Sequence, residues 1–245
     1  MSVLEEITRE VEADATSVGL VLHGSRAAGT ARDGSDFDLM RVVTDDAYPA
    51  RAALREKRTG ADGLAADVFY SSPGQLSELA ERPDWRVGML VTGRVLVDRG
   101  PLAALVEETV RRAGEHAFDG LDELYDGYLN CFVRSLKAWR RGDELGGRMQ
   151  AAESALYLVR TLFALERRWH PYHDQLAAPL GELEVAQGWA TGELAEAILR
   201  LVRDADPTFQ QELELKVEAL LESRGVAHQW GPDDDLQPLK EHRFR

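Results

Sequence analysis

The stretch His23–Met40 reads HGSRAAGTARDGSDFDLM and combines a Gly-Ser step, a loop of small residues and two aspartates one residue apart. Residues 18–22 before it, VGLVL, are short, β-branched and apolar, which is typical of a buried strand. Residues 36–43, DFDLMRVV, predict a second strand. Because alternate residues of a strand leave the same face, Asp36 and Asp38 are expected to project side by side, with Cα atoms about 7 Å apart.

Two close carboxylates on a buried sheet cost free energy unless positive charge lies between them. A divalent cation is the obvious neutraliser, and a set of oxygen ligands suits Mg²⁺, which also binds phosphates. Residues 64–70, LAADVFY, predict a third strand whose central acid is Asp67. If that strand neighbours the second one, Asp36, Asp38 and Asp67 could hold two metal ions, an arrangement suited to displacement at phosphorus.

The Gly24-Ser25 step follows the first predicted strand and is expected to open a short helical turn that includes Arg26. Glycine lets backbone amides approach a ligand closely, and helix N-termini attract phosphate. We therefore expect this turn to hold the β- and γ-phosphates of a nucleotide, with the Ser25 hydroxyl as a further donor. His23 beside it is interpreted as a structural histidine with satisfied ring nitrogens.

The rest of the chain predicts a small mixed α/β domain over residues 1–100 and an all-α domain over residues 101–245. A helix is expected at 2–16, another from Pro73, and a strand at 94–97 before the turn-rich exit DRGP. Residues 46–62 are polar and give no clear pattern. Helical periodicity alone follows, with helices expected at 101–116, 121–141, 146–168, 174–187, 191–204 and 207–224 and a loose tail from Gly225, GPDDD included. The fold class is therefore α+β.

The charge balance limits the choice of partners. The 245 residues carry a formal net charge of -14, with 17 acids and 12 bases in residues 1–100 and 26 acids and 17 bases afterwards. This charge opposes binding to nucleic acid backbones and anionic membranes and favours a cationic partner. The single cysteine, Cys131, excludes an internal disulfide. With an acidic N-terminus and no long apolar run, the chain is expected to be cytoplasmic.

The motifs also carry a family resemblance. A Gly-Ser step, an Asp-x-Asp pair eleven positions after the serine, and a separate acidic strand resemble the nucleotidyltransferase superfamily that includes DNA polymerase β. The segments GSRAAGT and SDFDL are most similar to the antibiotic (aminoglycoside) nucleotidyltransferases. The segment 151–172, AAESALYLVRTLFALERRWHPY, resembles the helical C-terminal domain of the members that act on small molecules.

This resemblance implies a small mixed-sheet nucleotidyltransferase domain followed by a helical substrate-binding domain. It implies transfer of a nucleoside monophosphate from ATP or another NTP to a hydroxyl, with release of pyrophosphate. Asp36 and Asp38 would bind both Mg²⁺ ions, and Asp67 would bind the ion that activates the acceptor and could take its proton. Arg26 or Arg32 would stabilise charge on the phosphates.

Several alternatives stay open at this level. Some antibiotic-modifying members take their general base from the helical domain, where Glu153 forms a stripe with Tyr157 and Arg160 beside the expected apolar face; the same stripe could be a surface Glu–Arg ladder. That apolar face is expected to comprise Met149, Ala152, Leu156, Val159 and Phe163. The acidic second half favours a small cationic, aminoglycoside-like acceptor.

Three other activities compete with that interpretation. They are AMP transfer to a protein, as in the minimal nucleotidyltransferase antitoxins, nucleotide sensing without catalysis, and RNA end modification. The net charge of -14 opposes the last of these. A homodimer with a shared cleft is a further arrangement that the resemblance allows.

Overall fold

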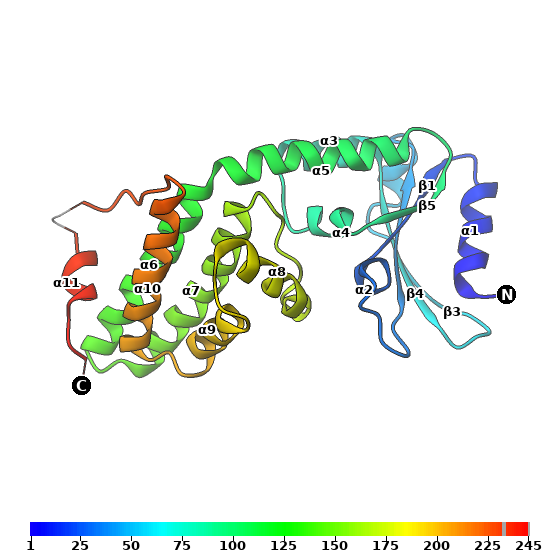
Figure 1. Cartoon of the computed structure of the whole chain (residues 1–245). Coiled ribbons are helices and arrows are strands. Elements are labelled where there is room, and N and C mark those ends of the chain that lie inside the picture. Colours follow the sequence, from blue (N-terminus) through cyan, green and yellow to red (C-terminus); the bar gives the residue numbers. More distant parts are fainter. Residues whose placement is uncertain (232–233, 245) are drawn as a thin grey trace. The chain divides into compact units, whose positions relative to one another are not determined.

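The computed structural model describes residues 1–231 and 234–244, which divide into two compact units, Met1–His116 and Ala117–Arg245 (Figure 1). The domain boundary predicted at residue 100 lies earlier than this division. The reason is α5 (Leu102–Asp119), which continues the first unit beyond the last strand: its Thr109 hydroxyl lies 3.4 Å from the Leu76 carbonyl oxygen, to which it donates. The α+β fold class predicted from the sequence is confirmed.

The first unit contains one mixed sheet in the strand order β3-β4-β2-β1-β5. The strands are β1 (Ser17–His23), β2 (Phe37–Val43), β3 (Arg55–Thr59), β4 (Ala65–Ser71) and β5 (Arg94–Asp98). The β2–β4 pair is parallel and the other pairs are antiparallel. The four predicted strands are confirmed within a residue or so at each end, whereas β3 lies inside the polar stretch that gave no clear pattern.

Helix α1 (Val3–Ala13) covers one face of the sheet. Its buried residues Val3, Ile7 and Val11 pack against the sheet residues Leu20, Leu22, Leu39, Ala66, Val68 and Val97. A capping box between Ser2 and Glu5 starts the helix, as the spacing of these residue types favours. Because side chains alternate along a strand, Asp38 and Asp67, which neighbour Leu39 and Val68, project from the opposite face.

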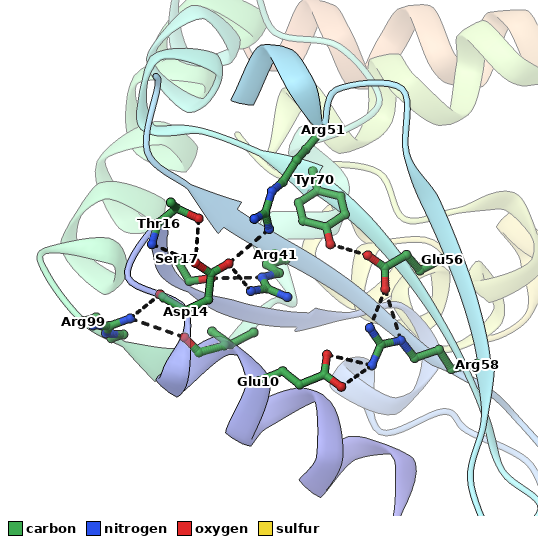
Figure 2. A network of polar contacts seen from close by, with 11 residues as sticks. Glu10, Asp14, Thr16, Ser17, Arg41, Arg51, Glu56, Arg58, Tyr70 and Arg99 are labelled. Carbon is green, nitrogen blue, oxygen red and sulfur yellow. Dashed lines mark hydrogen bonds and ion pairs between the residues drawn. The ribbon is translucent and has the colours of Figure 1, made fainter. Parts of the chain in front are cut away.

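A polar network ties the turn after α1 to the sheet (Figure 2). The Asp14 carboxylate accepts from Arg41 Nη2 at 2.6 Å and lies 3.1 Å from Arg51 Nη1. The backbone N–H of Thr16, its hydroxyl and both guanidinium groups lower the pKa of Asp14 to about 2. The segment 48–54, which carries Arg51 and includes the short 3₁₀ turn η1 (Tyr48–Ala50), is thereby anchored to the sheet.

Three short helices complete the first unit around the other face and the edges of the sheet. They are α2 (Gly24–Ala28), α3 (Pro73–Glu81) and α4 (Val87–Val91). The predicted helical turn at Gly24 and the helix beginning at Pro73 are both present, and Ser72 caps the latter by accepting from the Gln75 N–H.

The second unit is the helical bundle that the sequence predicts. After the last turns of α5, its elements are α6 (Leu121–Arg140), α7 (Glu144–Leu165), η2 (His173–Gln175), α8 (Ala177–Gln187), α9 (Glu193–Arg203), α10 (Pro207–Ser223) and α11 (Leu236–Lys240). The predicted apolar face of α7 is wrong in part, because Met149 and Leu156 are 63% and 40% exposed. A stripe of smaller residues, including Ala151 and Ala155, is buried instead and lets α6 and α7 approach closely.

The predicted loose tail from Gly225 is also wrong where the structure describes it. Leu236 and Leu239 of α11 are buried, and Trp230 and Phe244 pack against the core of the second unit. Residues 232–233 of the GPDDD motif lie outside the described residues. In the described part of the chain, every helix is too short or too polar to span a bilayer.

Candidate functional site

Two of the acids singled out in the sequence, Asp38 and Asp67, lie side by side on neighbouring strands, in a row that His23 extends to a third strand. In the parallel pair, Asp38 of β2 lies opposite Asp67 of β4. In the antiparallel β1–β2 pair, His23 at the end of β1 lies opposite Asp38. Residues directly opposite one another point to the same face, so His23, Asp38 and Asp67 form what we call the carboxylate row, on the face that α1 does not cover. Asp36 is exposed and lies just before β2 begins.

The carboxylate row carries excess negative charge at neutral pH. Burial, followed by the negative charges of Asp36 and Asp67, raises the pKa of Asp38. His23 does not offset this charge, because burial and the neighbouring Arg55 lower its pKa to about 4. The expected satisfaction of the His23 ring is wrong for Nε2, which is buried and has no hydrogen-bond partner among the described residues.

Two basic residues of β3 partly balance Asp67. Arg55 Nε lies 3.4 Å from Asp67 Oδ1, and Lys57 Nζ lies 4.0 Å from Asp67 Oδ2. Both basic side chains are exposed, Arg55 to 64%, so solvent screens these pairs and other cations can displace them. Sequence reasoning missed Arg55 and Lys57 because it missed β3, whose sequence REKRT has no apolar alternation to indicate a strand.

The donor chemistry of the site fits Mg²⁺, which prefers carboxylate oxygens. Asp67 Oδ1 is buried without a hydrogen-bond partner in the described part of the chain, although Arg55 is near. Over residues 1–231 and 234–244, however, no three His, Cys, Asp or Glu side chains already converge on one point as metal ligands would. Asp36, Asp38 and Asp67 are therefore neighbouring donors whose side chains would have to turn toward a shared ion.

The Gly24-Ser25 turn packs directly against the row. Gly24 has φ +69°, a left-handed conformation that favours glycine, and it opens α2 right after β1. A Cβ built on Gly24 would overlap the Asp38 carboxylate. The absence of a side chain at this position is what lets the turn and Asp38 share the space.

We predict that Gly24→Ala destabilises the protein more than Gly29→Ala does. Both glycines have positive φ, but a Cβ on Gly29 would meet nothing within 4 Å. The second variant thus measures the backbone strain alone, about 1–2 kcal/mol. The first adds displacement of the Asp38 carboxylate, which we expect to cost about another 1–2 kcal/mol. Urea unfolding of both variants tests this. If both lose the same free energy of unfolding, the close approach of Gly24 to Asp38 does not contribute to stability.

The two candidate phosphate-binding arginines differ in their surroundings. Arg26 Nε donates to the carbonyl oxygens of Ser35 and Asp36 at 3.0 and 3.1 Å, and its guanidinium lies 4.2 Å from the Phe37 ring centroid. Arg26 therefore positions the loop that carries Asp36, and its role toward phosphate stays a prediction. Arg32 is exposed in the same loop, and its role toward phosphate stays a prediction.

Glu153, the other candidate base, lies on the exposed side of α7 in the second unit. Its carboxylate accepts from Gln150 Nε2 at 3.3 Å, and the Arg160 guanidinium lies 5.8 Å from the Tyr157 ring centroid. These contacts lie along one helix. The role of Glu153 as general base stays a prediction.

Comparison with known proteins bears on the fold. No family model and no curated protein matches the chain. Among solved structures, it is similar to a nucleotidyltransferase-like protein from Exiguobacterium sibiricum 255-15, with 14% sequence identity and a TM-score of 0.51. The match covers 90% of this chain and 73% of that protein. The chain therefore has a nucleotidyltransferase-like fold.

Proposed function

We propose that this protein transfers a nucleoside monophosphate from ATP or another NTP to a hydroxyl group of a small molecule and releases pyrophosphate. The observation that carries the proposal is the pairing of Asp38 with Asp67 on adjacent parallel strands, with the Gly24-Ser25 turn packed against Asp38. A glycine turn beside paired acids would bring amides that can bind phosphate next to oxygens that can bind a metal ion. The nucleotidyltransferase-like fold supports the same reaction class.

Asp36, Asp38 and Asp67 are the residues that would hold Mg²⁺, two ions in our proposal. When bound, the ions would neutralise the phosphates and lower the cost of forming the attacking oxyanion. The raised pKa of Asp38 supports this assignment, because a carboxylate crowded by Asp36 and Asp67 gains from a cation.

The residues of the chain would perform the remaining work. Backbone amides of the Gly24-Ser25 turn and the Ser25 hydroxyl would bind the phosphates. The acceptor oxygen forms a bond to the α-phosphorus, the bond from that phosphorus to the bridging oxygen of the β-phosphate breaks, and pyrophosphate leaves. The hydroxyl proton passes to a carboxylate, for which Asp67 and Glu153 are the two candidates.

Replacing Asp67 by Asn is expected to reduce the rate of Mg²⁺- and ATP-dependent pyrophosphate release at least about hundredfold, because the amide neither takes the proton nor holds the cation as a carboxylate does. Asp46→Asn, at an exposed position outside the row, is the control and should keep the wild-type rate. Full activity of the Asp67 variant together with an inactive Glu153→Gln variant would move the base to the second unit.

One observation favours a second candidate, a nucleotide-binding protein that does not turn over. Arg55 and Lys57 already place positive charge beside Asp67. Calorimetric binding of ATP, with no pyrophosphate release in the presence of any acceptor, would support this candidate over the transferase.

A further inference from the structure

A cavity of about 200 Å³ lies beside the carboxylate row. Its floor includes Met40 and Phe69, which follow Asp38 and Asp67 by two residues and therefore share their face of the sheet. The anchored segment 48–54 contributes one wall, and α3 and α4 contribute the other. All the lining residues belong to the first unit.

We propose that this cavity binds the acceptor, and that the acceptor is a single ring without net positive charge. The inference rests on the proposed transferase function and adds the substrate class. Its first support is topological: α2, which carries the Gly24-Ser25 turn, packs on β1 and β2, whereas the cavity extends from β2 over β4 to the first residue of β3. Nucleotide phosphates and cavity would thus flank the carboxylate row from opposite sides.

The size of the cavity limits the acceptor. A cavity of about 150 Å³ in a protein core holds one benzene molecule. At about 200 Å³, this cavity has room for one substituted six-membered ring, and the further linked rings of an aminoglycoside would have to lie outside it. The aromatic side chains of Tyr48 and Phe69 offer flat apolar surface to such a ring.

The charge of the lining limits it further. The lining residues include two arginines, Arg55 and Arg86, and no acid. Each arginine has a carboxylate partner outside the lining: Arg86 Nη2 lies 2.8 Å from Asp84 Oδ2, and Arg55 pairs with Asp67. The Arg55 guanidinium lies 5.6 Å from the Phe69 ring centroid while its Nε approaches Asp67, so this side chain stands between the cavity and the carboxylate row. The carboxylates of Asp67 and Asp84 reduce the positive charge of this wall, but the groups that face the cavity itself are guanidinium groups. A cationic acceptor would meet these like charges first, whereas a neutral or anionic one would not. This differs from the cationic acceptor that the acidic second half of the sequence favours, and the experiments below decide between them.

The segment 48–54 is held in place well enough to define a specific site. Arg51 binds Asp14, and the Tyr48 hydroxyl lies 3.5 Å from Gln75 Oε1. Ala53 of this segment is exposed and lines the cavity, so a large side chain there can fill the space without entering the core. Ala50 is exposed on the same segment and does not line the cavity, which makes it a matched control.

The charge preference is tested with rings that differ only in one substituent. Mg²⁺- and ATP-dependent pyrophosphate release is measured with glucose, glucuronate and glucosamine, in which the charged compounds each differ from glucose at one carbon, and with benzyl alcohol and its 4-carboxylate and 4-aminomethyl derivatives. We expect kcat/KM for the neutral or anionic member of at least one set to exceed that for the amine at least tenfold. Arg86→Gln should reduce the preference of the carboxylate over the amine. Kanamycin serves as the cationic, multi-ring comparison.

The position is tested with Ala53→Trp. This variant should raise the KM for the preferred ring at least tenfold and leave the Kd for Mg²⁺-ATP within twofold of wild type, while Ala50→Trp changes neither. Weaker ATP binding by Ala53→Trp would show that the cavity holds the nucleobase and would overturn the inference. Better turnover of an amine or of kanamycin, or no response to any single ring, would overturn it too. A wild-type protein that neither binds Mg²⁺-ATP nor releases pyrophosphate would instead remove the proposed function itself.

Discussion

Asp38→Asn is expected to abolish nucleotidyl transfer and at the same time to stabilise the metal-free protein. The folded-state pKa of Asp38 is raised by burial and by Asp36 and Asp67. An acid whose pKa is higher in the folded state favours folding below its unfolded value, near 4, and loses that contribution as pH rises through the folded value. At pH 7 the metal-free protein therefore carries the full penalty of the ionised carboxylate, which the neutral amide removes. If Asp38 is a metal ligand as proposed, catalysis should fall at least about a thousandfold, which corresponds to about 4 kcal/mol of lost transition-state stabilisation.

The two readouts separate a catalytic role from a merely structural one. Thermal unfolding of the metal-free proteins at pH 7 should give a higher Tm for the Asp38 variant than for wild type, and the difference should shrink as the pH approaches 4. Mg²⁺ should raise the Tm of wild type and of the Asp46→Asn control but not that of the Asp38 variant. A lower Tm for the metal-free Asp38 variant, or retained turnover, would contradict the proposal that Asp38 is a carboxylate destabilised by its neighbours in the absence of metal and a ligand of the metal ion when it is bound.

The position of the carboxylate row was predictable because it depends on strand periodicity and little else. VGLVL and DFDLMRVV are short apolar runs, and a period of two places Asp36 and Asp38 on one face. The adjacency of the third strand was a conditional expectation, and the opposition of Asp38 and Asp67 in the β2–β4 pair fulfils that condition. The glycine that allows the turn to approach Asp38 was also visible as the Gly-Ser step after the first strand.

The cations around the row were not predictable in the same way. β3 is an edge strand whose residues are exposed or half-buried, so REKRT carries no apolar face that would reveal a strand. Arg55 and Lys57 reach Asp67 only because β3 pairs with β4 in the register that sets Lys57 opposite Asp67. That register is set by the hairpin that joins β3 to β4, and the sequence pattern did not identify this hairpin or its turn.

Burial in the second unit departed from prediction for a related reason. On α7 the larger apolar residues Met149 and Leu156 suggested the core face, but close helix packing selected the smaller Ala151 and Ala155. The acidic composition of the tail suggested disorder. Lys240 near its end, however, pairs with Glu214 and Glu218 of α10. Composition averages over a segment, whereas such a contact depends on single residues.

Lys240→Met is expected to cost the second unit about 3–5 kcal/mol of unfolding free energy at pH 8. The side chain of Lys240 is 4% exposed; its Nζ lies 2.6 Å from Glu218 Oε1 and 3.4 Å from Glu214 Oε1. Glu214 is fully buried, and burial raises its pKa to about 7 although Lys240 opposes that shift. Without the ammonium group, the buried Glu214 and the half-buried Glu218 remain close together without their lysine partner. Helix α11 then loses its ion pairs to α10 and keeps the hydrogen bond from Gln211 Nε2 of α10 to the Leu239 carbonyl oxygen.

The cost of Lys240→Met is expected to depend on pH, because Glu214 titrates near neutrality. Because the folded pKa of Glu214 lies above its unfolded value, the stabilising contribution of the protonated acid is present below about 4.5 and is lost as pH rises through about 7. The cost of Lys240→Met should therefore be larger at pH 8 than at pH 5.5, where Glu214 takes up a proton, and adding Glu214→Gln should recover a large part of it.

Lys137→Met is the control: Lys137 pairs with Asp235 of the same C-terminal segment at more exposed positions, so its loss should cost about 1 kcal/mol or less. Urea unfolding combined with hydrogen exchange of α10 and α11 measures both. A cost for Lys240→Met as small as that for Lys137→Met, or one that does not change with pH, would mean that the ion pairs of Lys240 do not stabilise the C-terminal segment. Its apolar contacts and the hydrogen bonds from Gln211 would then hold it.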